Sequence, residues 1–172
     1  MSKPIRSLFV LAGIIVLLLA IRYAPAPRFI YNTTPSFPTG VYQIDREVSS
    51  YHLNDLVYFA EPTPQLYIAR HRGYLPARGN FMKRIGGLPG DEICIDAEEK
   101  VLLINGVLRG PVFVEDTIGR PLNPNVGCWV VPSGHFFPFS PYERSYDGRY
   151  LGAVPVSSIE GRLVPLFIQE EN

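Results

Sequence analysis

Residues 81–91 read FMKRIGGLPGD, an apolar strand signal that runs directly into a turn. Gly90 suits the positive φ that the third position of a type II turn requires. A second strand-and-turn signal follows at residues 101–109, VLLINGVLR, where Asn105-Gly106 favours a two-residue type I′ hairpin turn. The stretch from residue 81 to residue 109 therefore predicts short antiparallel strands joined by tight turns.

The same pattern extends in both directions from this stretch. Seventeen prolines and fifteen glycines among 172 residues, without low-complexity runs, are typical of many turns between short strands. Helical periodicity is nearly absent after residue 30. Further strands are expected at residues 41–44, 56–60, 65–70, 129–131, 135–139 and 163–168. We predict an all-β domain over residues 29–172, built as a coiled antiparallel sheet or a partly closed β-barrel.

The N-terminal segment has a different character. Leu8–Ile21 reads LFVLAGIIVLLLAI, and Ser7–Ala26 supplies the length of about 20 residues that a bilayer span needs if Arg22 reaches the interface. Lys3 and Arg6 precede the segment, so the positive-inside rule keeps the N-terminus cytoplasmic. Residues 1–28 are thus predicted to be a cytoplasmic N-terminus and single transmembrane helix, which places residues 29–172 on the periplasmic face of a bacterial inner membrane.

A cleaved signal peptide is the competing interpretation, because Ala24-Pro25-Ala26 has the form of an A-x-A cleavage site. Pro27 would follow the cut, and proline lacks an amide hydrogen and fixes its φ angle. An uncleaved anchor is therefore the prediction.

Charge and the metal-binding residue types exclude some functions. The formal net charge is zero, which gives no support to nucleic-acid binding. His52, His71 and His135 show no metal-ligand spacing and stand in no triad motif, so neither a metal nor a cofactor is expected. Cys94 and Cys128 are compatible with one disulfide in an exported domain, and two buried free thiols are the alternative.

Ser36 and Lys83 stand in unusual local sequences. Ser36 lies in TPSFPTG at residues 34–40, where prolines on both sides exclude a helix interior. Lys83 is surrounded by apolar residues, and burial of its amine would lower its pKa and leave it able to act as a base. Taken alone, the two residues are better explained as a turn serine and an exposed strand lysine.

Four segments together resemble the bacterial signal peptidase I family, in the order in which that family carries them. They are SFPT at 36–39, NDLVYF at 54–59, KRIGGLPGD at 83–91 and SYDGRYLG at 145–152. The family's G-D-N-R-D-N stretch is replaced by SPYER at 140–144, and its large inserted β-domain and second membrane span are missing. The compact length and the PSFPTGVY and SYDGRYLG forms are more similar to the conjugative-transfer branch, the TraF-type peptidases.

The resemblance implies a role for each matching residue. Ser36 would attack the scissile carbonyl, and Lys83 would be its general base. The backbone amide of Ser36 and the hydroxyl of Thr34 would form the oxyanion hole, with donors worth about 3–4 kcal/mol of barrier. Asp147 would belong to the catalytic apparatus, and Arg149 would pair with it as a structural ion pair near the lysine.

The expected function is that of a membrane-anchored serine endopeptidase. Its substrate would be a membrane-inserted exported precursor, with a conjugative pilin as the first candidate. The acyl-enzyme formed with this substrate would react either with water or with the substrate's own amino group, and the second reaction gives a cyclic product. One alternative is a broad-specificity signal peptidase I. Another, of a different class, is a non-catalytic membrane-tethered docking module. The sequence does not indicate the oligomeric state.

Overall fold

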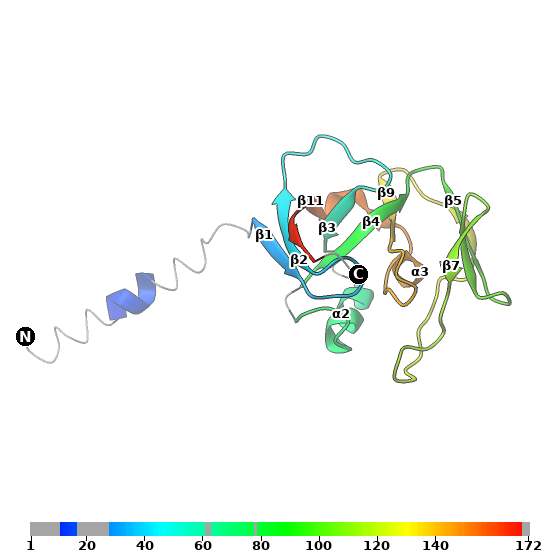
Figure 1. Ribbon diagram of the computed structural model, residues 1–172, viewed down its shortest axis with the longest axis horizontal. Coiled ribbons are helices and arrows are strands. Elements are labelled where there is room, and N and C mark those ends of the chain that lie inside the picture. The colour runs from blue at the N-terminus through cyan, green and yellow to red at the C-terminus, as the bar shows by residue number, and fades with distance from the viewer. Residues whose placement is uncertain (1–10, 17–27, 61–62, 78, 170–172) are drawn as a thin grey trace, which may run out of the picture.

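A computed structural model describes residues 11–16, 28–60, 63–77 and 79–169. These residues form a mostly β structure with strands in two antiparallel sheets (Figure 1). The strands are β1 (Phe29–Asn32), β2 (Gly40–Asp45), β3 (Leu56–Phe59), β4 (Phe81–Gly87), β5 (Glu92–Asp96), β6 (Val101–Ile104), β7 (Val107–Pro111), β8 (Gly127–Val130), β9 (His135–Phe139), β10 (Val154–Pro155) and β11 (Ile159–Ile168). The helical elements after residue 28 are α2 (Pro64–His71), α3 (Gly148–Leu151) and the 3₁₀ turn η1 (Val156–Ser158).

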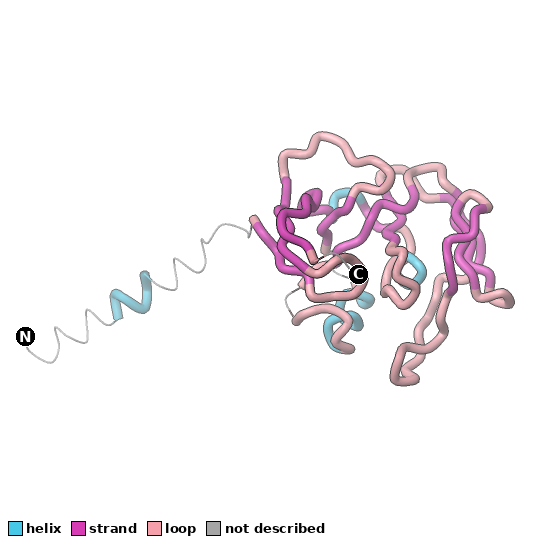
Figure 2. The backbone as a smooth tube through the Cα atoms, in the orientation of Figure 1, coloured by secondary structure: helices cyan, strands magenta, loops and turns pink. Residues whose placement is uncertain are grey.

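The larger sheet brings together both ends of the domain. Its seven strands follow the order β1-β2-β11-β3-β4-β9-β10, so the last strand of the chain lies between β2 and β3. The smaller sheet has the order β7-β6-β5-β8 and lies at the far end of the domain from β1 (Figure 2). The antiparallel β architecture predicted from the sequence is confirmed.

The predicted hairpin at residues 101–109 is also confirmed. Strands β6 and β7 pair across Asn105 and Gly106, whose φ angles are +50° and +73°. Positive φ at both central positions is the signature of a type I′ turn. Strands β2, β3, β4, β8, β9 and β11 likewise cover predicted strand segments.

The strand predicted at residues 65–70 is wrong, because this segment is the helix α2. Thr63 caps the helix by accepting a hydrogen bond from the backbone amide of Leu66, and Pro64 occupies the first turn, where a missing amide hydrogen costs nothing. Leu66 and Ala69 are buried on one face at a spacing of three residues. The Thr-Pro start signal and this spacing outweigh the short apolar-polar alternation.

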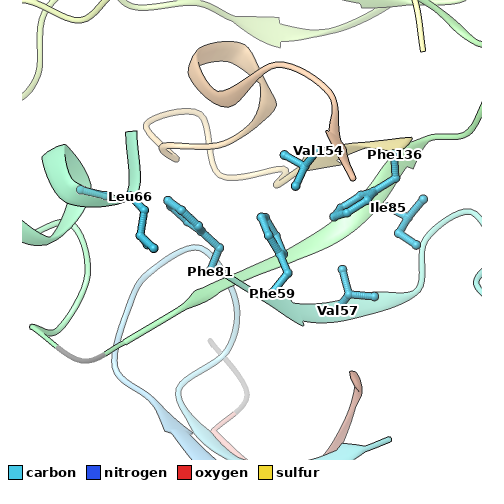
Figure 3. Packing of buried hydrophobic residues seen from close by; sticks show 8 residues of the cluster. Val57, Phe59, Leu66, Phe81, Ile85, Phe136 and Val154 are labelled. Atoms are coloured by element: carbon cyan, nitrogen blue, oxygen red, sulfur yellow. The ribbon is translucent and has the colours of Figure 1, made fainter. Parts of the chain in front are cut away.

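A core of aromatic residues lies between α2 and the larger sheet. Phe59 stacks on Phe81 with ring centroids 5.4 Å apart, and Phe136 meets Phe59 edge-on at 5.2 Å (Figure 3). Leu66 of α2 joins the same cluster. A second cluster lies against the smaller sheet and a third beneath β2. Strand β4 contributes to two of the three clusters and is thereby held firmly in place.

Most of the predicted anchor, residues 1–28, lies outside the described residues. Residues 11–16 are helical and exposed. Among the residues that the structure describes, no helix has the length and apolar character needed to cross a membrane.

Candidate active site

The loop that carries Ser36 is folded around the side chain of Asn32. The amide nitrogen of Asn32 donates hydrogen bonds to the backbone carbonyls of Thr34, Phe37 and Pro38 at 3.0, 2.8 and 3.2 Å. Its oxygen accepts from the backbone amide of Thr34 at 3.0 Å. Asn32 is buried, and one side chain therefore fixes the backbone on both sides of Ser36.

Phe37, the neighbour of Ser36, anchors this loop in the core beneath β2. Arg84 of β4 lies over the Phe37 ring, with its guanidinium carbon 5.7 Å from the ring centroid. This cation–π contact joins the serine loop to the strand that carries Lys83. Segments 47 residues apart in the chain are thus held side by side.

Lys83 points from the middle of β4 into the interior. It pairs with Val57 of β3 in the sheet register and is only 4% exposed. Beyond it, the register with β9 shifts between Ile85 and Gly87, and a Cβ at Gly86 would collide with Phe139. Glycine at this position allows β4 and β9 to approach closely, which helps to fix the strand that carries the lysine.

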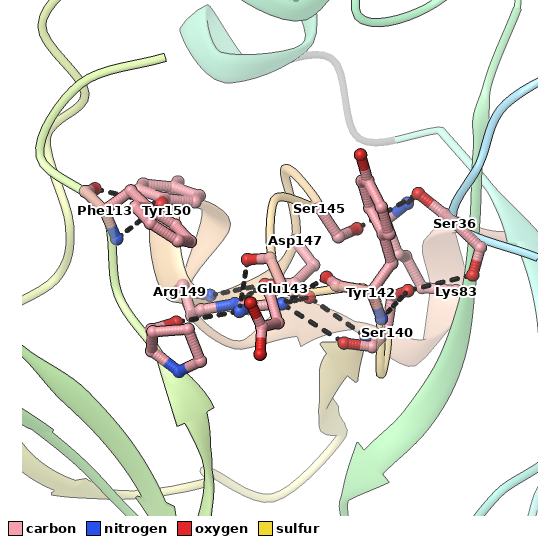
Figure 4. A network of polar contacts seen from close by, with 11 residues as sticks. Ser36, Lys83, Phe113, Ser140, Tyr142, Glu143, Ser145, Asp147, Arg149 and Tyr150 are labelled. Carbon is pink, nitrogen blue, oxygen red and sulfur yellow. Dashed lines mark hydrogen bonds and ion pairs between the residues drawn. The ribbon is translucent and has the colours of Figure 1, made fainter. Parts of the chain in front are cut away.

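The side chains of Ser36 and Lys83 meet. Lys83 Nζ lies 3.3 Å from Ser36 Oγ, within hydrogen-bond distance (Figure 4). Burial lowers the pKa of Lys83 to about 8, while the carboxylate of Asp147 opposes this shift and the guanidinium of Arg149 adds to it. A substantial fraction of the lysine is therefore neutral near pH 8 and able to accept a proton from the serine hydroxyl.

Ser145 completes the polar group around the nucleophile. Its Oγ lies 3.2 Å from Ser36 Oγ, and it is 2% exposed. The sequence pattern at residues 145–152 drew attention to Asp147 and Arg149 but assigned no role to this serine. Its position at the start of that pattern was the available signal.

Asp147 and Arg149 form a fully buried ion pair. Their side chains are 0% and 1% exposed, and Arg149 Nη2 lies 2.8 Å from Asp147 Oδ2. Asp147 also caps α3 by accepting from the Arg149 amide. Arg149 donates further hydrogen bonds to the carbonyls of Pro111, Ser140, Tyr142 and Glu143.

Ser140 connects this ion pair to the nucleophile. The backbone amide of Ser140 donates to Asp147 Oδ2 at 3.0 Å, and Ser140 Oγ donates to the backbone carbonyl of Ser36 at 3.0 Å. A continuous chain of hydrogen bonds therefore runs from Arg149 through Asp147 and Ser140 to the serine loop (Figure 4). Asp147 can act on Ser36 through this chain and on Lys83 through its charge.

The other predicted site residues have separate surroundings. Thr34 Oγ1 donates to Asn32 Oδ1 at 2.7 Å, so its hydrogen points at Asn32. The sheet register places Cys94 of β5 opposite Cys128 of β8, and the two form a disulfide in the smaller sheet. None of the three histidines lines the pocket at Ser36.

Ser36 and Lys83 open into a pocket of about 590 Å³. Aromatic residues contribute to several parts of its wall. The aromatic lining residues are Tyr31, Tyr58, Tyr74, Phe81, Phe113, Tyr142, Tyr146 and Tyr150. Tyr146 and Tyr150 stack with centroids 5.1 Å apart, and burial raises the pKa of Tyr146 to about 12. The pocket is large enough to take a stretch of peptide rather than a single small side chain.

A second Asp–Arg pair joins two parts of the far wall. Asp116 accepts hydrogen bonds from Tyr74 Oη at 2.5 Å and from Arg120 Nε at 2.6 Å. Arg120 Nη2 also donates to the carbonyl of Arg72, and its guanidinium lies over the Tyr74 ring. This group, which we call the Asp116 clasp, fastens the β7–β8 connection to the turn after α2.

Comparison with known proteins fits this geometry. A profile of the family described as signal peptidase, peptidase S26, matches residues 1–168. The chain belongs to this peptidase family. A member named conjugal transfer protein TraF from Agrobacterium tumefaciens strain 15955 is 33% identical over 94% of this chain and 96% of its own length. A protein of the same name from Agrobacterium fabrum strain C58 is 32% identical over 79% of this chain and 80% of its own length.

A solved structure of a signal peptidase I from Enterococcus faecalis V583 is 26% identical and covers 69% of this chain and 100% of that chain. Its TM-score is 0.38, which is too low to establish a shared arrangement of strands. The family assignment of the chain therefore rests on the sequence profile and on the TraF relatives.

Proposed function

We propose that the chain is a serine endopeptidase in which Ser36 is the nucleophile and Lys83 the general base. The observation that carries this proposal is the 3.3 Å separation of Lys83 Nζ and Ser36 Oγ at a lysine that burial makes less basic. Membership of the S26 peptidase family supports it. A non-catalytic docking module predicts two distant side chains and a lysine of ordinary pKa, so the geometry favours the enzyme.

The proposed reaction begins when the neutral amine of Lys83 takes the hydroxyl proton of Ser36 as Oγ attacks the scissile carbonyl. The Ser36 amide and the Thr34 hydroxyl, once the latter turns away from Asn32, would donate to the oxyanion. The Lys83 ammonium then protonates the leaving amine, which departs and leaves an ester on Ser36. In the last step an incoming nucleophile loses a proton to Lys83 as it attacks the ester, and Lys83 returns that proton to Ser36 Oγ as the ester bond breaks and the acyl group leaves.

The buried Asp147–Arg149 pair would act as the support of this machinery. The negative charge of Asp147 keeps the pKa of Lys83 from falling further, so the amine stays basic enough to accept a proton. Arg149 would hold the loop that presents Ser140 and Ser145 through its four carbonyl contacts. Asp147 is thus proposed as part of the catalytic apparatus and Arg149 as its structural partner.

We further propose that the substrate is an exported precursor at the membrane, and that the first candidate is a conjugative pilin. The relatives named as conjugal transfer proteins support this choice. A single-pass anchor in residues 1–28 would hold the site near the periplasmic membrane surface and raise the effective concentration of a membrane-inserted precursor. A broad-specificity signal peptidase would use the same residues and cleave many unrelated preproteins.

The test is intact mass spectrometry of a candidate pilin precursor in membranes that carry the wild-type chain or Ser36→Ala. A shortened product made by the wild type alone is expected. A product lighter than the linear fragment by one water would show that the substrate's own amine resolves the ester. Full processing by Ser36→Ala would refute the serine mechanism, and processing of many unrelated preproteins would favour the broad-specificity enzyme.

A further inference from the structure

Arg144 lies at the edge of the pocket, one residue before Ser145. Its side chain is exposed, and its guanidinium carbon lies 4.1 Å from the centroid of the Phe113 ring. Stacking on an aromatic face orients a guanidinium and leaves the N–H groups on its edge free to bind a ligand. Phe113 thus holds a cation in a defined orientation on the pocket wall.

No carboxylate of the described residues pairs with this cation. Two arginines that contact lining residues of the pocket are each matched to a carboxylate, Arg120 to Asp116 and Arg149 to Asp147. Within the described part of the chain, Arg144 forms no ion pair and donates no hydrogen bond. Glu115 lines the same pocket but does not pair with Arg144.

The position of Arg144 relative to the nucleophile limits what it can contact. Ser145 Oγ lies 3.2 Å from Ser36 Oγ, and Phe113 lies at the opposite end of the polar network from Ser36 (Figure 4). An extended peptide advances about 3.3–3.6 Å per residue. Arg144 and Ser36 line the same pocket, so a peptide that is bound at Ser36 and continues along the wall toward Phe113 would pass the guanidinium.

We propose that Arg144 binds a carboxylate of the substrate and so determines specificity a few residues from the scissile bond. The inference rests on the proposed peptidase function and names a chemical class for its substrate. A guanidinium binds a carboxylate through two parallel hydrogen bonds, and the aromatic walls weaken competition from water. The carboxylate belongs either to an acidic side chain or to the C-terminus of the precursor.

The experiment uses the full chain in detergent and synthetic peptides built on one Ala-rich cleavable core. Glu or Gln is placed in turn at each position from three residues before to four residues after the scissile bond. At one position the wild type should cleave the Glu peptide about tenfold faster than the Gln peptide in kcat/KM. Arg144→Gln should remove this preference, so that the variant cleaves the Glu and Gln peptides with equal kcat/KM.

Two further variants distinguish a specific contact from general charge effects. Arg109→Gln removes an exposed arginine of β7 that does not line the pocket, and it should keep the full preference for Glu. Arg144→Glu should reverse the preference, so that a Lys peptide is cleaved faster than a Glu peptide at the same position. The same peptides with amidated C-termini distinguish the two sources of the carboxylate, because amidation removes recognition of the terminal carboxylate and leaves recognition of an acidic side chain unchanged.

Binding to Ser36→Ala, followed by fluorescence anisotropy, provides a readout that does not need cleavage. This variant should bind the preferred carboxylate peptide about tenfold more tightly than its neutral match, and Arg144→Gln in the same background should remove the difference. Equal affinities, or no binding of either peptide, would overturn the role of Arg144. Cleavage by the wild type with no position dependent on Arg144 would overturn it too and leave the peptidase proposal standing.

Discussion

The two Asp–Arg pairs around the pocket have the same chemistry and different surroundings. Asp147 and Arg149 are 0% and 1% exposed, whereas Asp116 and Arg120 are 7% and 35% exposed. The buried pair is bonded to the loop that carries Ser140 and, through it, to the backbone of Ser36. The outer pair fastens two connections of the far wall.

This difference separates two tasks that one pocket must perform. A buried pair cannot exchange its partners for water, so it holds the reacting groups in one arrangement at all times. The outer pair is more exposed, mainly at Arg120, so it can open at a smaller cost than the buried pair, which suits a wall that must admit a peptide. We therefore expect changes in the buried pair to affect the chemistry and changes in the outer pair to affect substrate binding.

The largest effect is expected for Arg149→Met. The change leaves the Asp147 carboxylate buried without its cation and removes donors from four backbone carbonyls. Urea unfolding should show a loss of about 3–5 kcal/mol in the free energy of unfolding, and processing activity should be abolished. The double variant Asp147→Asn/Arg149→Met removes the unpaired charge and should recover part of the stability but no activity. Unchanged stability in the single variant would show that the pair is not buried in solution.

Removal of the disulfide should affect stability without affecting the chemistry. Cys94 and Cys128 close a loop over a sequence separation of 34 in the smaller sheet, and neither residue lines the pocket at Ser36. Cys94→Ser/Cys128→Ser should lower the free energy of unfolding by about 3–4 kcal/mol. At a temperature where the variant is still folded, its rate of processing should equal that of the wild type. A large loss of activity in the folded variant would show that the smaller sheet shapes the catalytic site.

Lys83→Met should stabilise the fold while abolishing activity. Below the folded-state pKa of about 8, the amine is charged in both the folded and the unfolded state, and the cost of burying an ammonium is fully present. Above about 10.5 the amine is neutral in both states and the cost vanishes. The variant should therefore gain up to about 3 kcal/mol at pH 7, and the gain should shrink between pH 8 and 10.5. Urea unfolding at pH 7 and at pH 10 tests this, and an equal gain at both would contradict it.

The smallest effect is expected for Asp116→Asn. This change weakens the Asp116 clasp and leaves Ser36, Lys83 and the buried pair in place. The KM for a peptide substrate should rise a few-fold while kcat stays close to that of the wild type. Steady-state kinetics on Asp116→Asn and the wild type measure both constants, whereas Arg149→Met should show no measurable turnover. A loss of kcat in Asp116→Asn equal to that of Arg149→Met would remove the distinction between the two pairs.

The sequence predicted the parts of the fold and site that depend on local patterns. The Asn105-Gly106 turn followed from local chemistry, and the segments of Ser36 and Lys83 stood out from their immediate neighbours. The role of Ser140 could not be predicted in this way, because its bond to Ser36 joins residues 104 positions apart. Asn32 was missed for a different reason: nothing distinguishes an asparagine at the end of a strand from a surface residue until the loop folds around it.

The helix α2 and the disulfide show two further limits. The start signal of α2, Thr63-Pro64, is present in the sequence, but the strand prediction rested only on a short alternation of apolar and polar residues. The pairing of Cys94 with Cys128 depends on the register of β5 and β8, which spacing alone does not specify. Most of the predicted anchor in residues 1–28 lies outside the described residues and stays a prediction.

The central claim is that burial lowers the pKa of Lys83, so that part of its amine is neutral and able to accept the proton of Ser36. The pH dependence of processing tests this claim most directly. The initial rate should be measured between pH 6 and pH 10 for the wild type, with Lys83→Arg and Ser36→Ala as inactive references. The account predicts a rate that rises with pH and reaches half of its maximum near pH 8, where the buried amine loses its proton. A rate that does not change across this range, or that is still rising in proportion to hydroxide at pH 10, would contradict it.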